Sequence, residues 1–394
     1  MEHLKLTQFP ILPDYPMQSL RHQRGMTLVE WMVSMTVGLI LLAALTTLIG
    51  QQSRTQAELE KSSRQIENGR YAMQLLNDDI QMAGYYGEFS NVASLPLPPG
   101  TSDACSTTAA DLAALMAWPV QGYDWPSTTT VLPTCINAAN HVPGTDILVV
   151  RRVQPDAPLT PALTPASAAT AAGGQVYLQS GFTSSGLTFE KKLATGATTS
   201  EFNLQTQAKP ATATAAAVTA KPALLREFMV NIYYVSPCSV MANTVTCAST
   251  DDGGKPIPTL KMLELSADST TTRMKNISLV EGIENMQIDY GIDTNNDGAP
   301  DGLFVATTPP IATPTDPAQW ANVVALRVHL LARNNESSQG YVDPKTYALG
   351  YSNAGAVQTV TPTTDLYGNN VRSYKRRLFS QLIRVVNPSS RRDK

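Results

Sequence analysis

The sequence lacks the features by which many enzymes and nucleic-acid-binding proteins are recognised. Only 15% of its 394 residues are charged and the formal net charge is −3, so no field of one sign points to nucleic acid. No serine-hydrolase, zinc-protease, phosphate-loop or dinucleotide-binding motif occurs. Histidine is rare and scattered: the four are His3, His22, His141 and His329. These absences argue against an enzyme, and we expect no required cofactor and no specific nucleic-acid partner.

Cysteine is also scarce, and its spacing argues against the common metal sites. The four cysteines are Cys105, Cys135, Cys238 and Cys247, and no two of them form a C-x-x-C pair. An even number without metal-ligand spacing is typical of disulfides in an oxidising compartment. Four cysteines allow three connectivities, of which we favour the local one, Cys105–Cys135 with Cys238–Cys247.

Charge is almost absent between Met26 and Gly50, where Glu30 is the one formal charge. This run is longer than the roughly 20 residues that cross a bilayer as a helix, so it predicts a membrane span. Arg21 and Arg24 precede it, and positive residues favour the cytoplasmic side. We therefore expect the N-terminus in the cytoplasm and everything after residue 50 across the inner membrane. In an ordinary anchor, Glu30 would be tolerated because it lies close to the interface.

Proline is absent from Met26 to Gly87, so a single helix can continue beyond the span. We predict a helix from Met26 to Ala83 with Gly84 at its C-cap, and Gly38 and Gly69 as points where it could curve or unwind. Apolar residues recur at helical spacing in its polar half, 51–84. They are Leu59, Ile66, Met73, Leu76, Ile80 and Ala83.

Two acidic residues near the end of this helix, Asp78 and Asp79, have no apparent catalytic partner in the sequence. We interpret them as part of a solvated helix face or as helix–loop contacts.

The remaining segment, 85–394, alternates apolar and polar residues in several short stretches, such as TDILVVRRV and REFMVNIYYV. This period of two predicts half-buried antiparallel strands. Two inserts rich in Ala, Thr and Pro, near 154–174 and 207–223, have few large apolar residues and are expected to be surface loops. The predicted fold class is α+β, with a long N-terminal helix packed on an antiparallel sheet.

One polar motif, DTNNDGAPDG, resembles a calcium-binding loop of the EF-hand type. Its candidate ligands are Asp293, Asn295, Asp297, the carbonyl of Ala299, and Asp301. Hard oxygen ligands at this spacing suit Ca²⁺. The twelfth position is Phe304 instead of the usual glutamate, and no flanking helices are predicted. A turn built from Asn, Asp and Gly is therefore the alternative to a Ca²⁺ site of low affinity.

Basic residues followed by Gly25, Met26-Thr27-Leu28-Val29-Glu30 and the apolar run resemble the class III signal of type IV prepilins. The resemblance implies that a prepilin peptidase cuts between Gly25 and Met26, that the amine of Met26 is then methylated, and that Glu30 acts in subunit assembly. The leader would be residues 1–25. Met17 would begin a leader of ordinary length, and we expect translation to start there; a long leader, as in another pilin subclass, is the alternative.

RYAMQLLNDDIQMAGYYG, YYVSPC, NVVALRVHLLARN and KRRLFSQLIRVVN are similar to the PilW family of minor pilins. The resemblance implies a pilin-like fold and a non-enzymatic protein that primes type IV pilus assembly at or near the pilus tip. Its implied partners are other minor pilins, the major pilin and a large tip adhesin, and its implied roles are twitching motility and adhesion. The alternatives are a J-type minor pseudopilin of a type II secretion system and a membrane-anchored periplasmic binding module that does not assemble.

Overall fold

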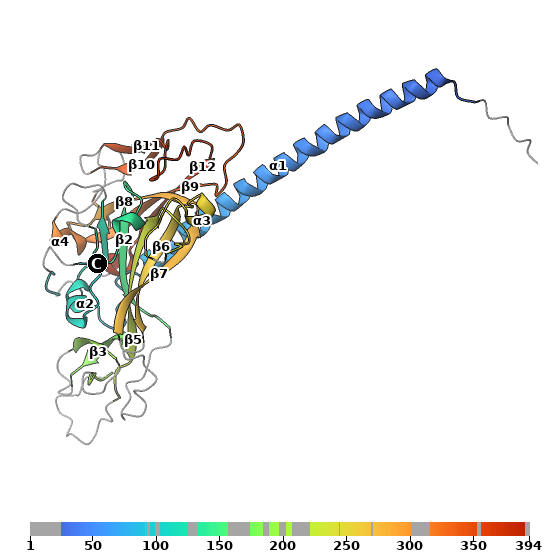
Figure 1. Cartoon of the computed structure of the whole chain (residues 1–394). Coiled ribbons are helices and arrows are strands. Elements are labelled where there is room, and N and C mark those ends of the chain that lie inside the picture. Colours follow the sequence, from blue (N-terminus) through green and yellow to red (C-terminus); the bar gives the residue numbers. More distant parts are fainter. Residues whose placement is uncertain are drawn as a thin grey trace, which may run out of the picture. The chain divides into compact units, whose positions relative to one another are not determined.

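The computed structural model contains one long helix, several short ones and two main β-sheets (Figure 1). It describes residues 25–90, 92, 95–98, 103–124, 132–156, 174–183, 189–196, 202–206, 221–243, 245–268, 271–301, 316–352 and 356–390. The helices are α1 (Leu28–Met82), α2 (Ala109–Leu115), α3 (Asp251–Gly254), α4 (Pro317–Trp320) and α5 (Val386–Ser390). The strands are β1 (Val120–Tyr123), β2 (Ile147–Val153), β3 (Val176–Phe182), β4 (Phe189–Thr195), β5 (Leu225–Ser236), β6 (Thr259–Asp268), β7 (Thr271–Glu281), β8 (Ile283–Ile292), β9 (Val323–Arg333), β10 (Tyr347–Tyr351), β11 (Val357–Val360) and β12 (Arg376–Arg384).

The chain divides into two compact units, Met1–Ala57 and Glu58–Lys394, and the boundary falls within α1. α1 is continuous through Gly38 and Gly69, where the sequence allowed a bend or local unwinding. It ends at Met82, and Gly84 has a φ of 72°, a conformation that glycine adopts without strain. The predicted helix and its glycine terminator are confirmed.

The sheets of the second unit are antiparallel, as predicted. β5 is central in the larger sheet, where it pairs with β2, β3 and β6; β1, β4 and β7 extend that sheet. In the smaller sheet β9 pairs with β8 and β12, while β10 and β11 form a hairpin. The N–H of Asp146 donates to the carbonyl of Met286 at 2.9 Å, which connects the start of β2 to β8.

Two hydrophobic clusters include alternate residues of β2 and β5, and therefore lie on opposite faces of these strands. Leu148 and Tyr233 pack with residues of α1, β8 and β9. Val149 and Phe228 pack with Tyr86 and with Leu112 of α2. The expectation that these strands are half-buried is wrong, because both faces are covered. Their nearly continuous apolar runs, ILVV and IYYV, are consistent with that double burial.

The buried face of α1 differs from the predicted apolar stripe at its beginning. Met73, Leu76, Ile80 and Ala83 are buried as expected, but Leu59 is 67% exposed. In its place the polar Gln65 is buried, and its Nε2 donates to the carbonyls of Ala332 at 2.7 Å and Lys375 at 3.0 Å. In this part of the helix, hydrogen bonds from Gln65 to the end of β9 and to the residue before β12 therefore replace apolar packing.

Gly69 has a packing role that the sequence did not indicate. A Cβ at this position would overlap the ring of Phe379 on β12. The absence of a side chain therefore lets an aromatic ring lie directly against the helix backbone.

The predicted inserts fall mainly outside the described residues, which stop at 156 and resume at 174, and stop again at 206 and resume at 221.

Candidate functional site

The N-terminal motif lies at the start of α1. Gly25, Met26 and Thr27 precede the first helical residue, Leu28, and Glu30 is in the first turn. The N–H of Glu30 donates to Thr27 Oγ1 at 3.3 Å, and the N–H of Thr27 donates to a carboxylate oxygen of Glu30 at 3.5 Å. This reciprocal pair is a capping box, which satisfies N–H groups that the start of a helix leaves without partners.

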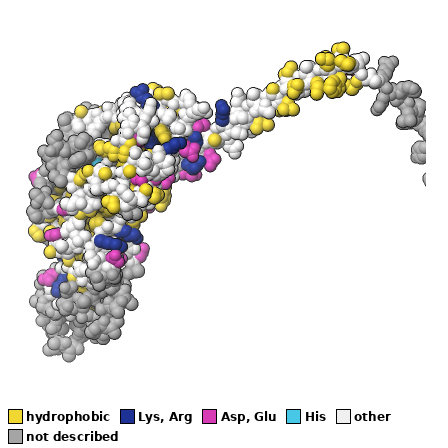
Figure 2. Space-filling model, viewed as in Figure 1, with side chains coloured by type: hydrophobic (Ala, Val, Ile, Leu, Met, Phe, Trp, Pro, Cys, Tyr) yellow, Lys and Arg dark blue, Asp and Glu magenta, His cyan; other side chains and the backbone are white. Residues whose placement is uncertain are grey.

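The apolar run that follows is exposed along its whole length. Every residue from Met26 to Gly50 is exposed, and the hydrophobic side chains of this part of α1 are yellow in Figure 2. Within the described residues, α1 is the one helix long and apolar enough to cross a membrane. An apolar surface of this extent is unfavourable in water, so lipid or neighbouring helices must cover it.

Asp79 attaches the polar half of α1 to the larger sheet. It is 6% exposed, and its Oδ1 accepts a hydrogen bond from Arg152 Nε on β2 at 2.5 Å. Its Oδ2 accepts from Asn231 Nδ2 at 2.9 Å and Tyr233 Oη at 2.8 Å, both on β5. Burial of the carboxylate is thus compensated by a cation and two neutral donors. Burial, and then the Asp79 charge, raise the pKa of Tyr233 well above its ordinary value.

This contact corrects the interpretation of the two neighbouring acids. Asp78 is exposed, as expected for a solvated helix face, whereas Asp79 is buried in a contact between helix and sheet.

Glu58 makes a second polar attachment, at the start of the second unit. Its Oε2 accepts hydrogen bonds from Lys375 Nζ and Ser338 Oγ, each at 2.6 Å, and its Oε1 lies 3.5 Å from Lys61 Nζ. The hydrogen bond from Lys375, followed by that from Ser338, lowers the pKa of Glu58 to about 2. The carboxylate therefore stays ionised and bonded well below neutral pH.

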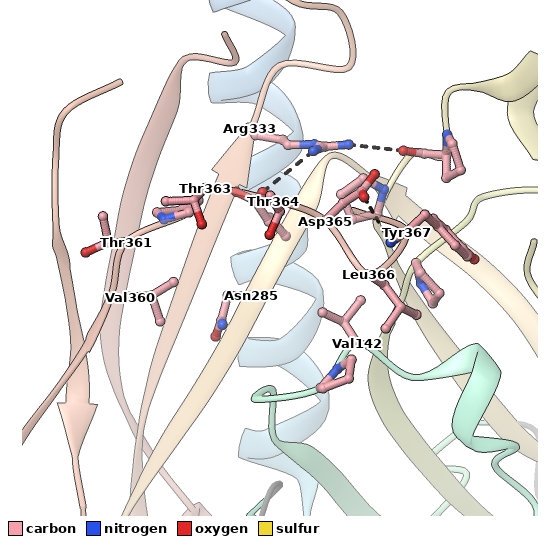
Figure 3. Close-up of a pocket in the computed structure, with 16 residues that line it drawn as sticks. Val142, Asn285, Arg333, Val360, Thr361, Thr363, Thr364, Asp365, Leu366 and Tyr367 are labelled. Carbon is pink, nitrogen blue, oxygen red and sulfur yellow. Dashed lines mark hydrogen bonds and ion pairs between the residues drawn. The ribbon is translucent and has the colours of Figure 1, made fainter. Parts of the chain in front are cut away.

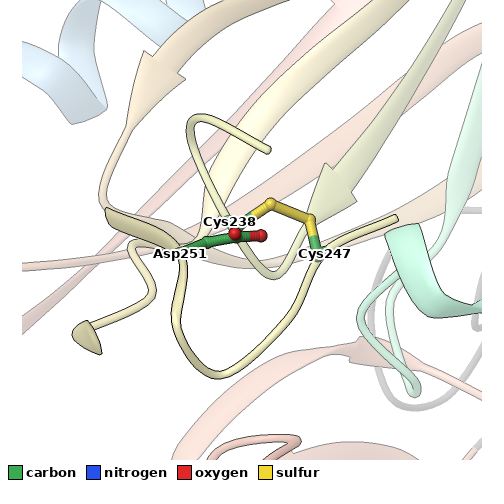
Figure 4. Close-up of side chains that lie close together, drawn as sticks. All are labelled: Cys238, Cys247 and Asp251. Carbon is green, nitrogen blue, oxygen red and sulfur yellow. A yellow bond between two sulfur atoms is a disulfide. The ribbon is translucent and has the colours of Figure 1, made fainter. Parts of the chain in front are cut away.

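The cysteines form the expected pairs, Cys105–Cys135 and Cys238–Cys247. The second disulfide closes a loop whose backbone is held by two acids that follow it. Asp251 accepts hydrogen bonds from the N–H groups of Ala242 and Ala248, and Asp252 from those of Ser239, Val240 and Ile257. Asp251 lies beside the two sulfur atoms of the Cys238–Cys247 disulfide (Figure 4). Because the sulfurs are bonded to each other, this group offers no thiolate to a metal.

The candidate calcium loop is closed by its own hydrogen bonds. Asp293 is fully buried and accepts from the N–H groups of Asn296 at 2.6 Å and Gly298 at 3.0 Å. Asp297 accepts from the N–H of Ala299 at 2.8 Å. Asp301 accepts from the N–H of Thr294 at 2.6 Å. Such bonds are those of a turn, and Asp301 Oδ2 accepts a second one from the Thr294 hydroxyl.

The ligand positions of this loop do not converge closely. Within the described residues, three Asp, Glu, His or Cys ligand atoms lie within 4.8 Å of one another only at Cys238, Cys247 and Asp251. The carboxylates of Asp293, Asp297 and Asp301 therefore do not all lie within that distance of one another. The twelfth position, Phe304, lies outside the described residues. The oxygen donors fit Ca²⁺ by type, but the carboxylates would have to come closer together to coordinate one ion.

The two described histidines each lie within hydrogen-bonding distance of a polar side chain. His141 Nε2 lies 3.1 Å from Thr145 Oγ1, and burial lowers the pKa of His141 to about 4. His329 Nε2 lies 3.2 Å from Asp289 Oδ2 in the smaller sheet. His3 and His22 lie outside the described residues.

A cavity of about 450 Å³ is lined mainly by proline, valine, leucine and threonine (Figure 3). Its charged side chains already have partners. Arg333 Nη2 donates to the carbonyl of Pro256 at 3.0 Å, and Arg333 Nη1 lies 3.6 Å from Glu284 Oε1. The cavity therefore offers packing surface, and its arginine is already engaged.

Two residues with clear roles in the structure were missed by the sequence reasoning. Thr27 could have been found from the pattern T-x-x-E before an apolar run, which is a known sign of a capping box. Asp79 had no comparable signal. Its partners are 73 residues away on β2 and 152 and 154 residues away on β5, and only the tertiary fold brings them together.

Comparison with known families gives two matches. Residues 232–387 match the family model of type IV pilus-assembly protein W (PilW), and residues 20–46 match the prokaryotic N-terminal methylation motif. Neither describes an enzyme family. No curated protein and no solved structure matches the chain. The first match includes β8, β9 and β12, whose buried residues pack in one hydrophobic cluster with those of α1. The second match covers the capping box and most of the apolar run. Together they support a type IV pilus-related pilin and are consistent with a prepilin-type member of the PilW family.

Proposed function

We propose that this protein is a minor pilin that primes type IV pilus assembly and resides at or near the pilus tip, where it supports twitching motility and adhesion. The observation that carries the proposal is the conjunction of an N-terminal methylation motif with a PilW match in one chain. The role is structural and not catalytic. The expected partners are the prepilin peptidase, other minor pilins, the major pilin and a large tip adhesin.

The N-terminal region follows from this function. The leader, 1–25, is removed in the cytoplasm between Gly25 and Met26, and the freed amine of Met26 is methylated. Residues 26–50 are held in the inner membrane, 51–84 continue the helix, and 85–394 form the periplasmic domain before assembly. The carboxylate of Glu30 pairs with the amine of a neighbouring subunit, because each charge is costly alone in lipid.

Mass spectrometry of the N-terminal peptide tests this processing. We expect N-methyl-Met26 in membranes from cells with an active prepilin peptidase and an unmethylated leader-bearing form in cells without it. The leader-bearing form also reveals whether translation starts at Met1 or Met17. An intact leader in peptidase-containing cells would contradict the pilin proposal and favour a simple membrane anchor.

We also propose that the loop at 293–301 binds Ca²⁺ weakly. The full chain in detergent should melt a few degrees higher when free Ca²⁺ is about ten times the dissociation constant, where binding contributes about 1.4 kcal/mol. Asp297→Asn should remove this rise, because the amide can keep the turn hydrogen bond but lacks the charge. Asp365→Asn is the matched control, since Asp365 accepts N–H bonds from Tyr367 and Asn369 in a turn without the calcium-loop spacing. No rise in the wild type would leave the loop as a turn only.

A further inference from the structure

The capping box at the start of α1 joins the proposed cleavage site to the assembly carboxylate. Thr27 follows Met26 directly, and its backbone N–H donates to the Glu30 carboxylate at 3.5 Å. Its hydroxyl oxygen accepts from the N–H of Glu30 at 3.3 Å. Ser34 Oγ donates to the carbonyl of Glu30 at 2.7 Å, which further ties this residue to the first turns. The carboxylate is thus directed back toward the end of the chain that cleavage would free.

This arrangement addresses a physical difficulty of the unassembled subunit. A carboxylate in apolar surroundings is costly unless it has hydrogen-bond donors or a cation. The start of a helix supplies free N–H groups and a partial positive charge, both of which favour an anion. Thr27 directs Glu30 into that position by fixing the first turn. Valine, which has nearly the same shape, cannot do this because it has no oxygen to accept the Glu30 N–H.

We propose that Thr27 is a positioning residue for Glu30. It holds the Glu30 carboxylate at the N-terminal end of α1 until the amine of a neighbouring subunit replaces the Thr27 N–H as the partner of that carboxylate. The inference rests on the proposed role of Glu30 in assembly. It assigns two successive partners to one carboxylate, the Thr27 N–H in the membrane and the neighbouring amine in the pilus.

Comparison of Thr27→Val with Thr27→Ser in the full chain tests this. In detergent micelles, Thr27→Val should speed hydrogen exchange of the Glu30 amide about fivefold, the equivalent of a typical cap of about 1 kcal/mol. In cells it should reduce the amount of protein in sheared pili several-fold at an unchanged membrane level. Thr27→Ser keeps the hydroxyl and should restore both. Normal incorporation of Thr27→Val, or a defect in Thr27→Ser equal to that of Thr27→Val, would overturn the proposal.

A parallel Glu30→Ala strain separates failure of this inference from failure of the assembly role. If Glu30→Ala is excluded from pili while Thr27→Val is incorporated normally, Glu30 acts in assembly without help from Thr27. If Glu30→Ala is itself incorporated normally, the assembly role of Glu30 is wrong and the inference fails with it.

Discussion

Asp79→Ala should destabilise the second unit by about 3–5 kcal/mol, the usual cost of removing one member of a buried ion pair. The substitution leaves Arg152, whose side chain is 16% exposed, without its counter-ion. It also leaves the Asn231 amide and the Tyr233 hydroxyl without an acceptor in a buried place. Thermal or denaturant unfolding of the full chain in detergent measures the change.

Two variants show whether this effect is specific. Asp78→Ala removes an exposed acid from the same turn and should change stability by no more than about 0.5 kcal/mol. Asp79→Asn retains one acceptor oxygen but not the charge, so its stability should lie between those of the wild type and Asp79→Ala. Equal stability of Asp79→Ala and Asp78→Ala would show that the Asp79 contact contributes little.

Glu30→Ala should lower incorporation into pili by about a hundredfold or more, if an unpaired amine in lipid costs 3–5 kcal/mol. Membrane insertion and cleavage should largely persist, because alanine only makes the span more apolar and the Gly25–Met26 bond is unchanged. Immunoblots of sheared pili and of membranes, normalised to the major pilin, provide the measurement.

Glu30→Gln distinguishes the charge from the capping hydrogen bond. Glutamine can accept the Thr27 N–H as glutamate does, but it cannot neutralise an amine. If charge pairing drives assembly, Glu30→Gln should be excluded from pili like Glu30→Ala. Incorporation of Glu30→Gln at the wild-type level would show that the cap alone accounts for the role of this residue.

Local patterns predicted much of this fold. The absence of proline from Met26 to Gly87 and the glycine at 84 defined α1 to within two residues at either end. Alternation identified β2 and β5 as strands, and proximity in sequence selected the observed disulfides among three connectivities. These features depend on interactions between residues that are near one another in the chain, which is why a single sequence reveals them.

Contacts between distant segments could not be predicted in this way. Leu59 fits an apolar stripe by spacing but is exposed, whereas Gln65 is buried because two carbonyls from β9 and the segment before β12 lie within its reach. Likewise, the sequence alone suggests that Gly69 weakens the helix, whereas the structure shows that the ring of Phe379 occupies the space that a Cβ would take. In each case the deciding group lies more than 250 residues away, and no periodicity within the helix carries information about it.

The attachment of α1 to the C-terminal part of the chain determines when the protein can finish folding. Gln65 bonds to a carbonyl 310 residues later, Gln381 donates to the Asn77 side chain across 304 residues, and Asn387 donates to the carbonyl of Ala83 across 304 residues. These partners are therefore synthesised about 300 residues after the parts of α1 that they contact. Such long sequence separations slow folding, because large loops must close before the contacts form. Asp79 can reach its partners on β2 and β5 once Tyr233 has been synthesised, whereas Gln65, Asn77 and Ala83 remain without these particular partners until the chain has been synthesised through Asn387.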